Sequence, residues 1–223
     1  RATILFGICQ NALYLGLNFV AMQTVEASLA AIIASTMPLL VALAGWILFG
    51  ERIAPLGFAG LIAGVIGVYI IMSARLQGDV DLYGVSLCVI GVIALTFATL
   101  AVRGATSGGN FLMIVGLQML VGSAVLSVFA VTTETVEVAW SWQLIAAFAY
   151  TTLVPGLAAT LVWFLLVQRI GATRAATFHF LNPFLGVAIA ALILSEALRL
   201  NDLIGVVVIM AGILAVQLSK QRH

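Results

Sequence analysis

Charged residues are scarce in this sequence, and their scarcity excludes a soluble protein. They make up 8% of the 223 residues, and 64% are hydrophobic, whereas a soluble globular domain carries about 25% charged residues. A chain with so few charges cannot cover its surface in water. The net charge of +1 and the lack of a basic run also give no reason to expect a nucleic-acid partner.

Residue patterns that carry catalysis or bind metals are also missing. The two cysteines, Cys9 and Cys88, fall in apolar runs, where a thiol usually packs as a small apolar side chain. The sequence shows no metal-ligand cluster, no glycine-rich phosphate loop, and no set of serine, histidine and aspartate within the apolar runs. We therefore expect no disulfide, no cofactor, no metal site and no enzymatic activity.

What the sequence does contain is a series of long apolar runs. About 20 residues of α-helix cross a hydrocarbon core of about 30 Å, and lipid offers backbone groups no partner outside a helix or a closed barrel. The runs do not alternate with the period of two that barrel strands require, so we predict an all-α, polytopic transmembrane helical bundle. The eight predicted helices are residues 3–22, 27–50, 56–74, 82–102, 111–131, 144–167, 172–194 and 200–218.

Basic residues near the ends of these spans predict the orientation, because positive charges beside a span are retained in the cytoplasm. If the loops alternate sides, one side receives Arg1, Arg52, Arg103, Arg169, Arg174, Lys220 and Arg222, and the other receives Arg75 and Arg199. The richer side is expected to be cytoplasmic. Both chain ends, including the C-terminus, then lie in the cytoplasm.

One design occurs twice, in residues 27–51 and 172–196. The matched pairs, all at a constant offset of 145 residues, are Pro38 with Pro183, Glu51 with Glu196, Gly60 with Gly205, and Gly67 with Gly212. Two unrelated apolar stretches would not share these residues in register, so we infer an internal repeat. The predicted topology runs the two copies through the membrane in opposite directions. Inverted repeats of this kind are typical of secondary transporters, with the substrate site near mid-membrane.

The element from proline to glutamate, followed by a glycine-rich span, resembles the EamA repeat of the drug/metabolite transporter (DMT) superfamily. The resemblance implies ten helices in two inverted five-helix units and the export or exchange of small metabolites. The chain is similar to bacterial amino-acid exporters of the YddG type, which implies an inner-membrane location. Residues 1–75 would be a first repeat without its first two helices, and residues 82–219 a second repeat of five. We therefore expect an N-terminal portion to precede Arg1.

The two repeated prolines are the first candidate functional residues. Pro38 and Pro183 each lie at the middle of a predicted span and should kink it, because proline donates no hydrogen bond to the carbonyl four residues back. Paired kinks would splay the two helices around a shared cavity. The alternative is a packing kink with no further role, which is common in membrane helices.

His179 is the ionisable group predicted deepest in the membrane apart from tyrosines, and such residues are candidates for function. It shares a polar and small helical face with Ala175, Asn182 and Gly186. We interpret this face, with Asn182, as lining a cavity. The alternative is a neutral histidine that a neighbouring helix satisfies.

Two further polar stripes complete the predicted binding site. The first span carries Asn11, Tyr14 and Asn18, and the sixth carries Thr152, Gly156, Thr160 and Trp163. These stripes would supply aromatic and hydrogen-bonding contacts to a solute. Polar side chains can instead join helices, and a tryptophan near a span end can belong to the headgroup belt. We expect the glycines of the third and fourth spans to pack helices, and Glu51 and Glu196 to anchor tight loops.

Together these features predict a secondary transporter that exports small metabolites, amino acids above all, by alternating access. The predicted partners are a small-molecule solute and the lipid bilayer, with a monomer as the expected assembly. No lysine or arginine lies at mid-membrane, which favours a neutral or zwitterionic solute. No carboxylate lies there either, which favours facilitated diffusion. The alternatives are a proton-coupled drug/metabolite exporter of the same fold, a channel, and a membrane protein that does not transport.

Overall fold

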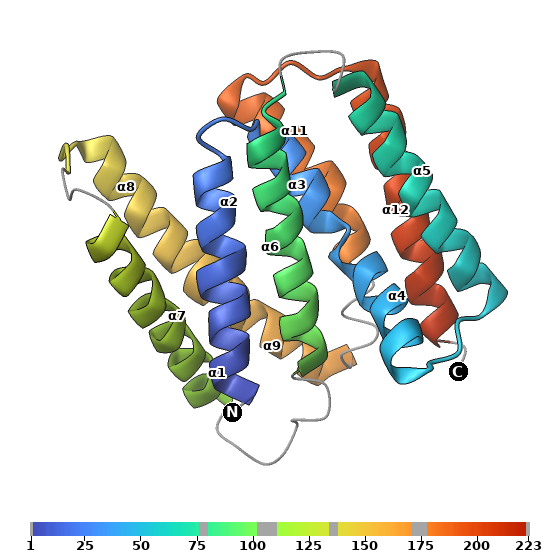
Figure 1. The fold of residues 1–223 in the computed structure, drawn as a ribbon, viewed down its shortest axis with the longest axis horizontal. Helices are drawn as coiled ribbons and strands as arrows, with labels where there is room; N and C mark the ends of the chain where they lie inside the picture. The colour runs from blue at the N-terminus through green and yellow to red at the C-terminus, as the bar shows by residue number, and fades with distance from the viewer. Residues whose placement is uncertain (1, 76–79, 102–110, 134–137, 171–177, 222–223) are drawn as a thin grey trace.

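The computed structural model describes residues 2–75, 80–101, 111–133, 138–170 and 178–221, and all regular structure in these ranges is helical (Figure 1). Six helical stretches are long and apolar enough to cross a membrane: Ala2–Ala21, Ala27–Phe49, Pro55–Arg75, Leu82–Ala101, Met113–Thr133 and Leu200–Ser219. Two shorter apolar stretches are Trp142–Ala158 and Phe178–Leu194. The prediction of an all-helical membrane bundle is confirmed.

Residues 2–101 form the first four of the predicted spans. Their elements are α1 (Ala2–Phe6), the π-helix η1 (Gly7–Tyr14), α2 (Leu15–Ala21), α3 (Ala27–Ser35), α4 (Met37–Phe49), α5 (Pro55–Arg75) and α6 (Leu82–Ala101). The remaining elements are α7 (Phe111–Thr133), α8 (Trp142–Thr151), the π-helix η2 (Thr152–Ala158), α9 (Ala159–Ile170), the 3-10 helix η3 (Phe178–Leu181), α11 (Asn182–Leu194) and α12 (Leu200–Gln221). The first part of the predicted 172–194 span lies outside the described residues.

Each repeated proline begins a new helix. Pro38 stands in the first turn of α4, after a break at Thr36, and Pro183 stands in the first turn of α11, after the 3-10 turn η3. Proline suits this position because the first N–H groups of a helix have no partner within it. Both prolines are buried. The proline-bearing spans are therefore two helices in series, where the sequence led us to expect one kinked helix.

Helices α5 and α12 form the closest helix pair of the bundle (Figure 1). A Cβ added to Gly212 would lie 2.6 Å from the carbonyl oxygen of Gly60, and one added to Gly67 would lie 2.8 Å from that of Gly205. The two contacts show that the helices are antiparallel, and the 145-residue offset exchanges one contact for the other. The glycine face of α5 thus packs against a helix, as predicted, and small residues allow this approach.

Helices α6 and α7, which follow α5, pack against the first half of the chain. Helix α6 lies against η1, α2, α3 and α4, while α7 lies against η1 and α1. One core of buried aliphatic residues joins α3 and α6 to α11 and α12, and it includes Leu29, Ile32, Val92, Val187 and Ile209. In the part of the chain that the structure describes, the two sequence repeats are interleaved in space, so a cavity between helices has walls from both.

Replacing Gly212 tests the helix pair. In Gly212→Ala the new Cβ would meet backbone atoms of Gly60 and Gly64 at 2.6 and 2.9 Å, and backbone cannot move aside as a flexible side chain can. We expect the helices to be forced apart, with a loss of about 1–3 kcal/mol of stability. The measurement is the midpoint of thermal unfolding in detergent, followed by tryptophan fluorescence.

Gly116→Ala is the matched control, because no atom lies within 4 Å of a Cβ at Gly116 in α7. Alanine favours a helix over glycine by about 0.5–1 kcal/mol, so this variant should unfold at the parental temperature or slightly higher. Equal midpoints for the two variants would contradict the close backbone approach of α5 and α12.

Candidate functional site

Two π-helical segments lie inside the membrane spans. They are η1, Gly7–Tyr14, and η2, Thr152–Ala158, and the offset of 145 residues takes the first residue of η1 to the first of η2. π-Helices are rare and occur frequently at functional sites. Sequence reasoning did not find them. Pro155 gives a local signal of irregularity in η2, but Gln10 takes its place in η1, where the sequence gives none.

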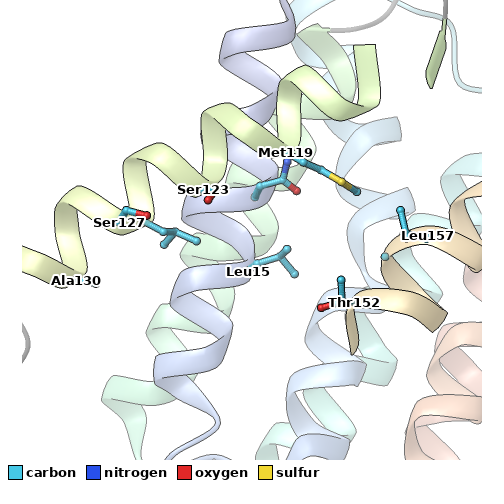
Figure 2. A pocket seen from close by; sticks show the side chains of 10 residues that line it. Leu15, Met119, Ser123, Ser127, Ala130, Thr152 and Leu157 are labelled. Atoms are coloured by element: carbon cyan, nitrogen blue, oxygen red, sulfur yellow. The ribbon is translucent and has the colours of Figure 1, made fainter. Parts of the chain in front are cut away.

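A cavity of about 520 Å³ opens between the two π-helical segments and α7 (Figure 2). This volume is within the range of about 300–1,000 Å³ that is usual for small-molecule sites. Its described lining residues are Asn11, Leu15, Met119, Ser123, Leu126, Ser127, Ala130, Thr152, Gly156 and Leu157. None of these carries a charge, and four of them offer hydrogen bonds.

Asn11 fixes η1 against α7 at this cavity. Its side chain is 9% exposed, and its Nδ2 donates a hydrogen bond of 3.0 Å to the carbonyl oxygen of Gln118. Gly122, one turn further along α7, leaves room for the asparagine on the facing helix. The contact means that a single polar side chain both joins two helices and reaches the cavity wall.

Three hydroxyl groups complete the polar lining. Serine and threonine in a helix often donate to the carbonyl three or four residues back, as Thr132 does to Val128 at 2.9 Å and Thr151 to Ala147 at 2.9 Å. No such bond is found for Ser123, Ser127 or Thr152 among the described residues. Their hydroxyls can therefore bind a solute. Sequence reasoning missed the two serines, although their spacing of four residues places both on one face of α7.

The remaining polar residues of the first span face other neighbours. Asn18 is 8% exposed, and its Nδ2 donates to the carbonyl oxygen of Tyr14 at 2.7 Å. A Cβ on Gly91 of α6 would lie 2.9 Å from the same Nδ2. Asn18 thus packs against α6, while Tyr14 is half-buried, and neither lines the 520 Å³ cavity. The predicted stripe is divided between two interfaces.

His179 and Asn182 form a pair where η3 meets α11. The Nδ2 of Asn182 lies 3.0 Å from the Nδ1 of His179, the histidine is half-buried, and the asparagine is exposed. Neither residue lines the cavity, nor do Pro38 and Pro183. Trp163 belongs to α9, but its side chain lies outside the described part of the structure. Of the described residues in the predicted polar stripes, this cavity includes Asn11 from the first span and Thr152 and Gly156 from the sixth.

Two other cavities of similar size have apolar walls. One of about 550 Å³ lies among α3, α4, α5 and α6, and one of about 530 Å³ lies among η1, α4 and α6. Thr36, in the first, donates its hydroxyl to the carbonyl oxygen of Ile33 at 2.7 Å. Such walls suit lipid chains. Of these three cavities, the one beside the π-helices presents several polar groups to a solute.

Comparison with known proteins identifies the family of this chain. The sequence model of the EamA-like transporter family matches residues 1–73 and 82–218. The chain belongs to the EamA-like transporter family. It is a multi-pass membrane protein of a transporter family, which confirms the resemblance to the EamA repeat seen in the sequence. The prediction of a YddG-type amino-acid exporter remains a prediction.

Individual relatives agree with this placement. The chain is 26% identical to "Uncharacterized transporter YvbV" of Bacillus subtilis strain 168, over 94% of this chain and 69% of the relative. It is 24% identical to "Protein PecM" of Dickeya dadantii strain 3937, over 93% of this chain and 71% of the relative. A solved crystal structure, 20% identical, matches with a TM-score of 0.67 over 98% of this chain and 77% of that one, which shows a shared fold.

Engineered cysteines can test whether water reaches the cavity. In a variant with Cys9→Ser and Cys88→Ala, we expect Ser127→Cys and Thr152→Cys to react with a membrane-impermeant thiol reagent. Val128→Cys is the control, because Val128 is 67% exposed on the opposite face of α7, where we expect lipid to surround it. Thiols react as thiolates, which form in water, so the cavity positions should react about tenfold faster or more. Equal rates at all three positions would contradict an aqueous cavity.

Proposed function

We propose that this protein is a secondary transporter that exports small neutral or zwitterionic metabolites, amino acids above all, across the bacterial inner membrane by alternating access. The observation that supports the proposal best is the uncharged, hydrogen-bonding lining of the cavity between η1, η2 and α7. Family membership supports transport as the activity. The amino-acid substrate, the export direction and the mechanism are our inferences.

The polar lining suits both ends of an amino acid. A carboxylate accepts hydrogen bonds, which the hydroxyls of Ser123, Ser127 and Thr152 can donate. An ammonium group donates hydrogen bonds, which the amide oxygen of Asn11 can accept. A zwitterion has no net charge, so it needs no buried ion of opposite sign. A phosphorylated solute would need a lysine or arginine to replace its hydration, and none is found among the described lining residues.

The apolar part of the lining suits the side chain of such a solute. Leu15, Leu126 and Leu157 contribute aliphatic walls, and Met119 adds a flexible one that adapts to different shapes (Figure 2). A site of this kind recognises the common backbone of amino acids by hydrogen bonds and accepts a range of apolar side chains.

His179 and Asn182 are proposed to face the same solute route at another point. An exposed asparagine within a membrane span is unfavourable in lipid, and such residues usually face a bundle interior or a water-filled cavity. Their mutual contact of 3.0 Å keeps the two polar groups together. The role of the prolines beside them, as proposed here, is to place the helix breaks that widen the route.

Facilitated diffusion is the proposed energetics, because no aspartate, glutamate or histidine lines the cavity among the described residues. Proton-driven carriers usually carry the proton on a carboxylate within the membrane. The excess of arginine and lysine at the end that holds both termini supports a cytoplasmic location for that end. Export then means binding from the cytoplasmic side and release on the other.

Substitution of the serines tests the site. In liposomes that contain the purified protein, we expect Ser123→Ala and Ser127→Ala each to raise the half-saturation concentration for labelled leucine about fivefold, since each removes one hydrogen bond to the solute. Thr132→Ala is the matched control: Thr132 lies on the same helix, but its hydroxyl already bonds Val128 and Phe129. Unchanged saturation in both serine variants would rule out this cavity as the site.

The same uptake assay tests His179. We expect His179→Ala to slow uptake while the protein remains monodisperse in detergent, because the proposed route loses a polar group. Normal uptake by this variant would remove His179 from the route without affecting the serine result.

The proposed energetics can be tested separately. Preloaded unlabelled amino acid should accelerate uptake of labelled amino acid, and uptake should saturate. An imposed pH gradient should leave the final accumulation unchanged, because no proton moves with the solute. Accumulation driven by the pH gradient would instead support the proton-coupled exporter, and flux without saturation or counterflow would support a channel.

A further inference from the structure

At one end of the bundle, a side chain from the second repeat caps a helix of the first. Glu196 follows α11, and its Oε1 and Oε2 accept hydrogen bonds from the backbone N–H groups of Ala27 and Ser28, at 2.8 and 3.0 Å. The residue before α3, Glu26, makes no side-chain cap of its own. A carboxylate suits this position because the first N–H groups of a helix are unpaired and the helix dipole favours negative charge there.

A buried ion cluster lies beside this cap. Arg75, at the end of α5, is 2% exposed, and Asp202, in the first turn of α12, is fully buried. The guanidinium is bidentate to Asp202, with Nε to Oδ1 at 3.2 Å and Nη2 to Oδ2 at 2.8 Å, and its Nη1 also donates to Glu26. Arg199 donates from its backbone to Asp202 at 3.2 Å and from its side chain to the carbonyl oxygen of Ala74 at 3.2 Å.

The pKa of Glu196 agrees with this arrangement. Partial burial raises the pKa of Glu196. Hydrogen bonds from Ser28 and Ala27 and the positive charge of Arg75 together lower the pKa by more than burial raises it, so the pKa lies below its usual value. Because the pKa of this carboxyl is lower in the folded protein, its ionised form contributes to the stability of the fold at neutral pH. This contribution is lost as the pH falls through the pKa of the folded state. Glu196 is thus held as an anion in the contact.

The positions equivalent in the sequence repeat carry a different set of residues. With the 145-residue offset, Glu196 corresponds to Glu51, but Arg75 corresponds to Lys220, Asp202 to Gly57 and Glu26 to Gly171. Where α5 and α12 meet at their other end, Gly57 packs against Ser219, with a Cβ on the glycine 2.5 Å from Oγ of the serine. Both carboxylates of the ion cluster therefore have glycine as their counterpart.

We propose that Glu26, Arg75, Glu196 and Asp202 form an ionic latch that holds this end of the bundle closed, and that the carrier rests in the state closed at this end. The inference rests on the proposed function, since a latch has this role only in a protein that opens at each end in turn. The predicted topology makes this the extracytoplasmic end. Release of solute there requires the latch to open.

In this proposal, α3 and α11 are the helices that move apart when the latch opens. They pack against each other, and each belongs to a span that a proline divides into two helices. Any separation of their ends on the latch side must break the two hydrogen bonds to Glu196. Arg75 and Asp202 fix the neighbouring α5 and α12, so Glu26, which contacts Arg75, links the start of α3 to that fixed pair.

The test follows the reactivity of a cysteine hidden by the latch. Ser28 is 1% exposed, and its backbone N–H, which Ser28→Cys keeps, donates to Glu196. In Cys9→Ser/Cys88→Ala protein that carries Ser28→Cys, we expect slow reaction with a charged maleimide. Adding Glu196→Gln should accelerate the reaction about tenfold, because hydrogen bonds to a charged acceptor are replaced by weaker neutral ones. Gln23→Cys, at an exposed position in the α2–α3 connection, reports the intrinsic reaction rate.

Glu51→Gln, the counterpart at the opposite end, is the matched control and should leave the reactivity at Ser28→Cys unchanged. If Glu196→Gln does not purify as a monodisperse protein, Glu196→Asp retains the charge but shortens the side chain, and a several-fold increase is expected. No acceleration in a folded Glu196 variant, or equal acceleration by Glu51→Gln, would overturn the latch. This measurement uses no solute, so a failure to transport amino acids would overturn the proposed function and leave the latch standing.

Discussion

Inside a membrane, each backbone N–H and C=O must find its partner within the protein, and this constraint governs the structure. The described spans satisfy it with helices and depart from α-helical bonding at few points. These are the two π-helical segments and the two breaks before the repeated prolines. Irregular backbone is tolerated at membrane depth where it is buried in protein or faces a water-filled space. The polar cavity lies between two of these departures, η1 and η2.

The repeat places these departures in pairs. η1 and η2 begin at equivalent positions, as do α4 and α11, and the contacts between α5 and α12 exchange under the same offset. The cavity does not share this regularity: α7 forms one wall and packs on η1, while η2 forms another. A site built from similar but non-identical walls can hold an asymmetric solute. In an amino acid, one end accepts and the other donates hydrogen bonds, and the cavity lining contains hydroxyl donors and the amide oxygen of Asn11.

The sequence predicted the spans well, because the insertion of about 20 apolar residues into lipid depends on their own hydropathy and hardly on the neighbouring helices. It also predicted that the glycine faces pack. It could not predict the site in full. Periodicity places Asn11 and Asn18 on one face, but only the position of the neighbouring helices shows that one meets α7 and the other α6. Ser123 and Ser127 were overlooked because two hydroxyls in an apolar span usually bond their own helix. Glu196 was expected to anchor its own loop, and its partner lies 169 residues away in sequence.

The difference between the two ends has a consequence for transport. Repeat symmetry alone would make the two closed states nearly equal in free energy, because each end would close with the same contacts. Here one end closes with a buried arginine and two carboxylates, and the equivalent positions of the sequence repeat carry a lysine and two glycines. A difference of about 1–3 kcal/mol between the two closures would favour one state about 5–150-fold. A carrier that rests closed on the outer side stays available to solutes in the cytoplasm, so the charged residues at one end would set which side the empty carrier faces, while the solute gradient sets the direction of net transport.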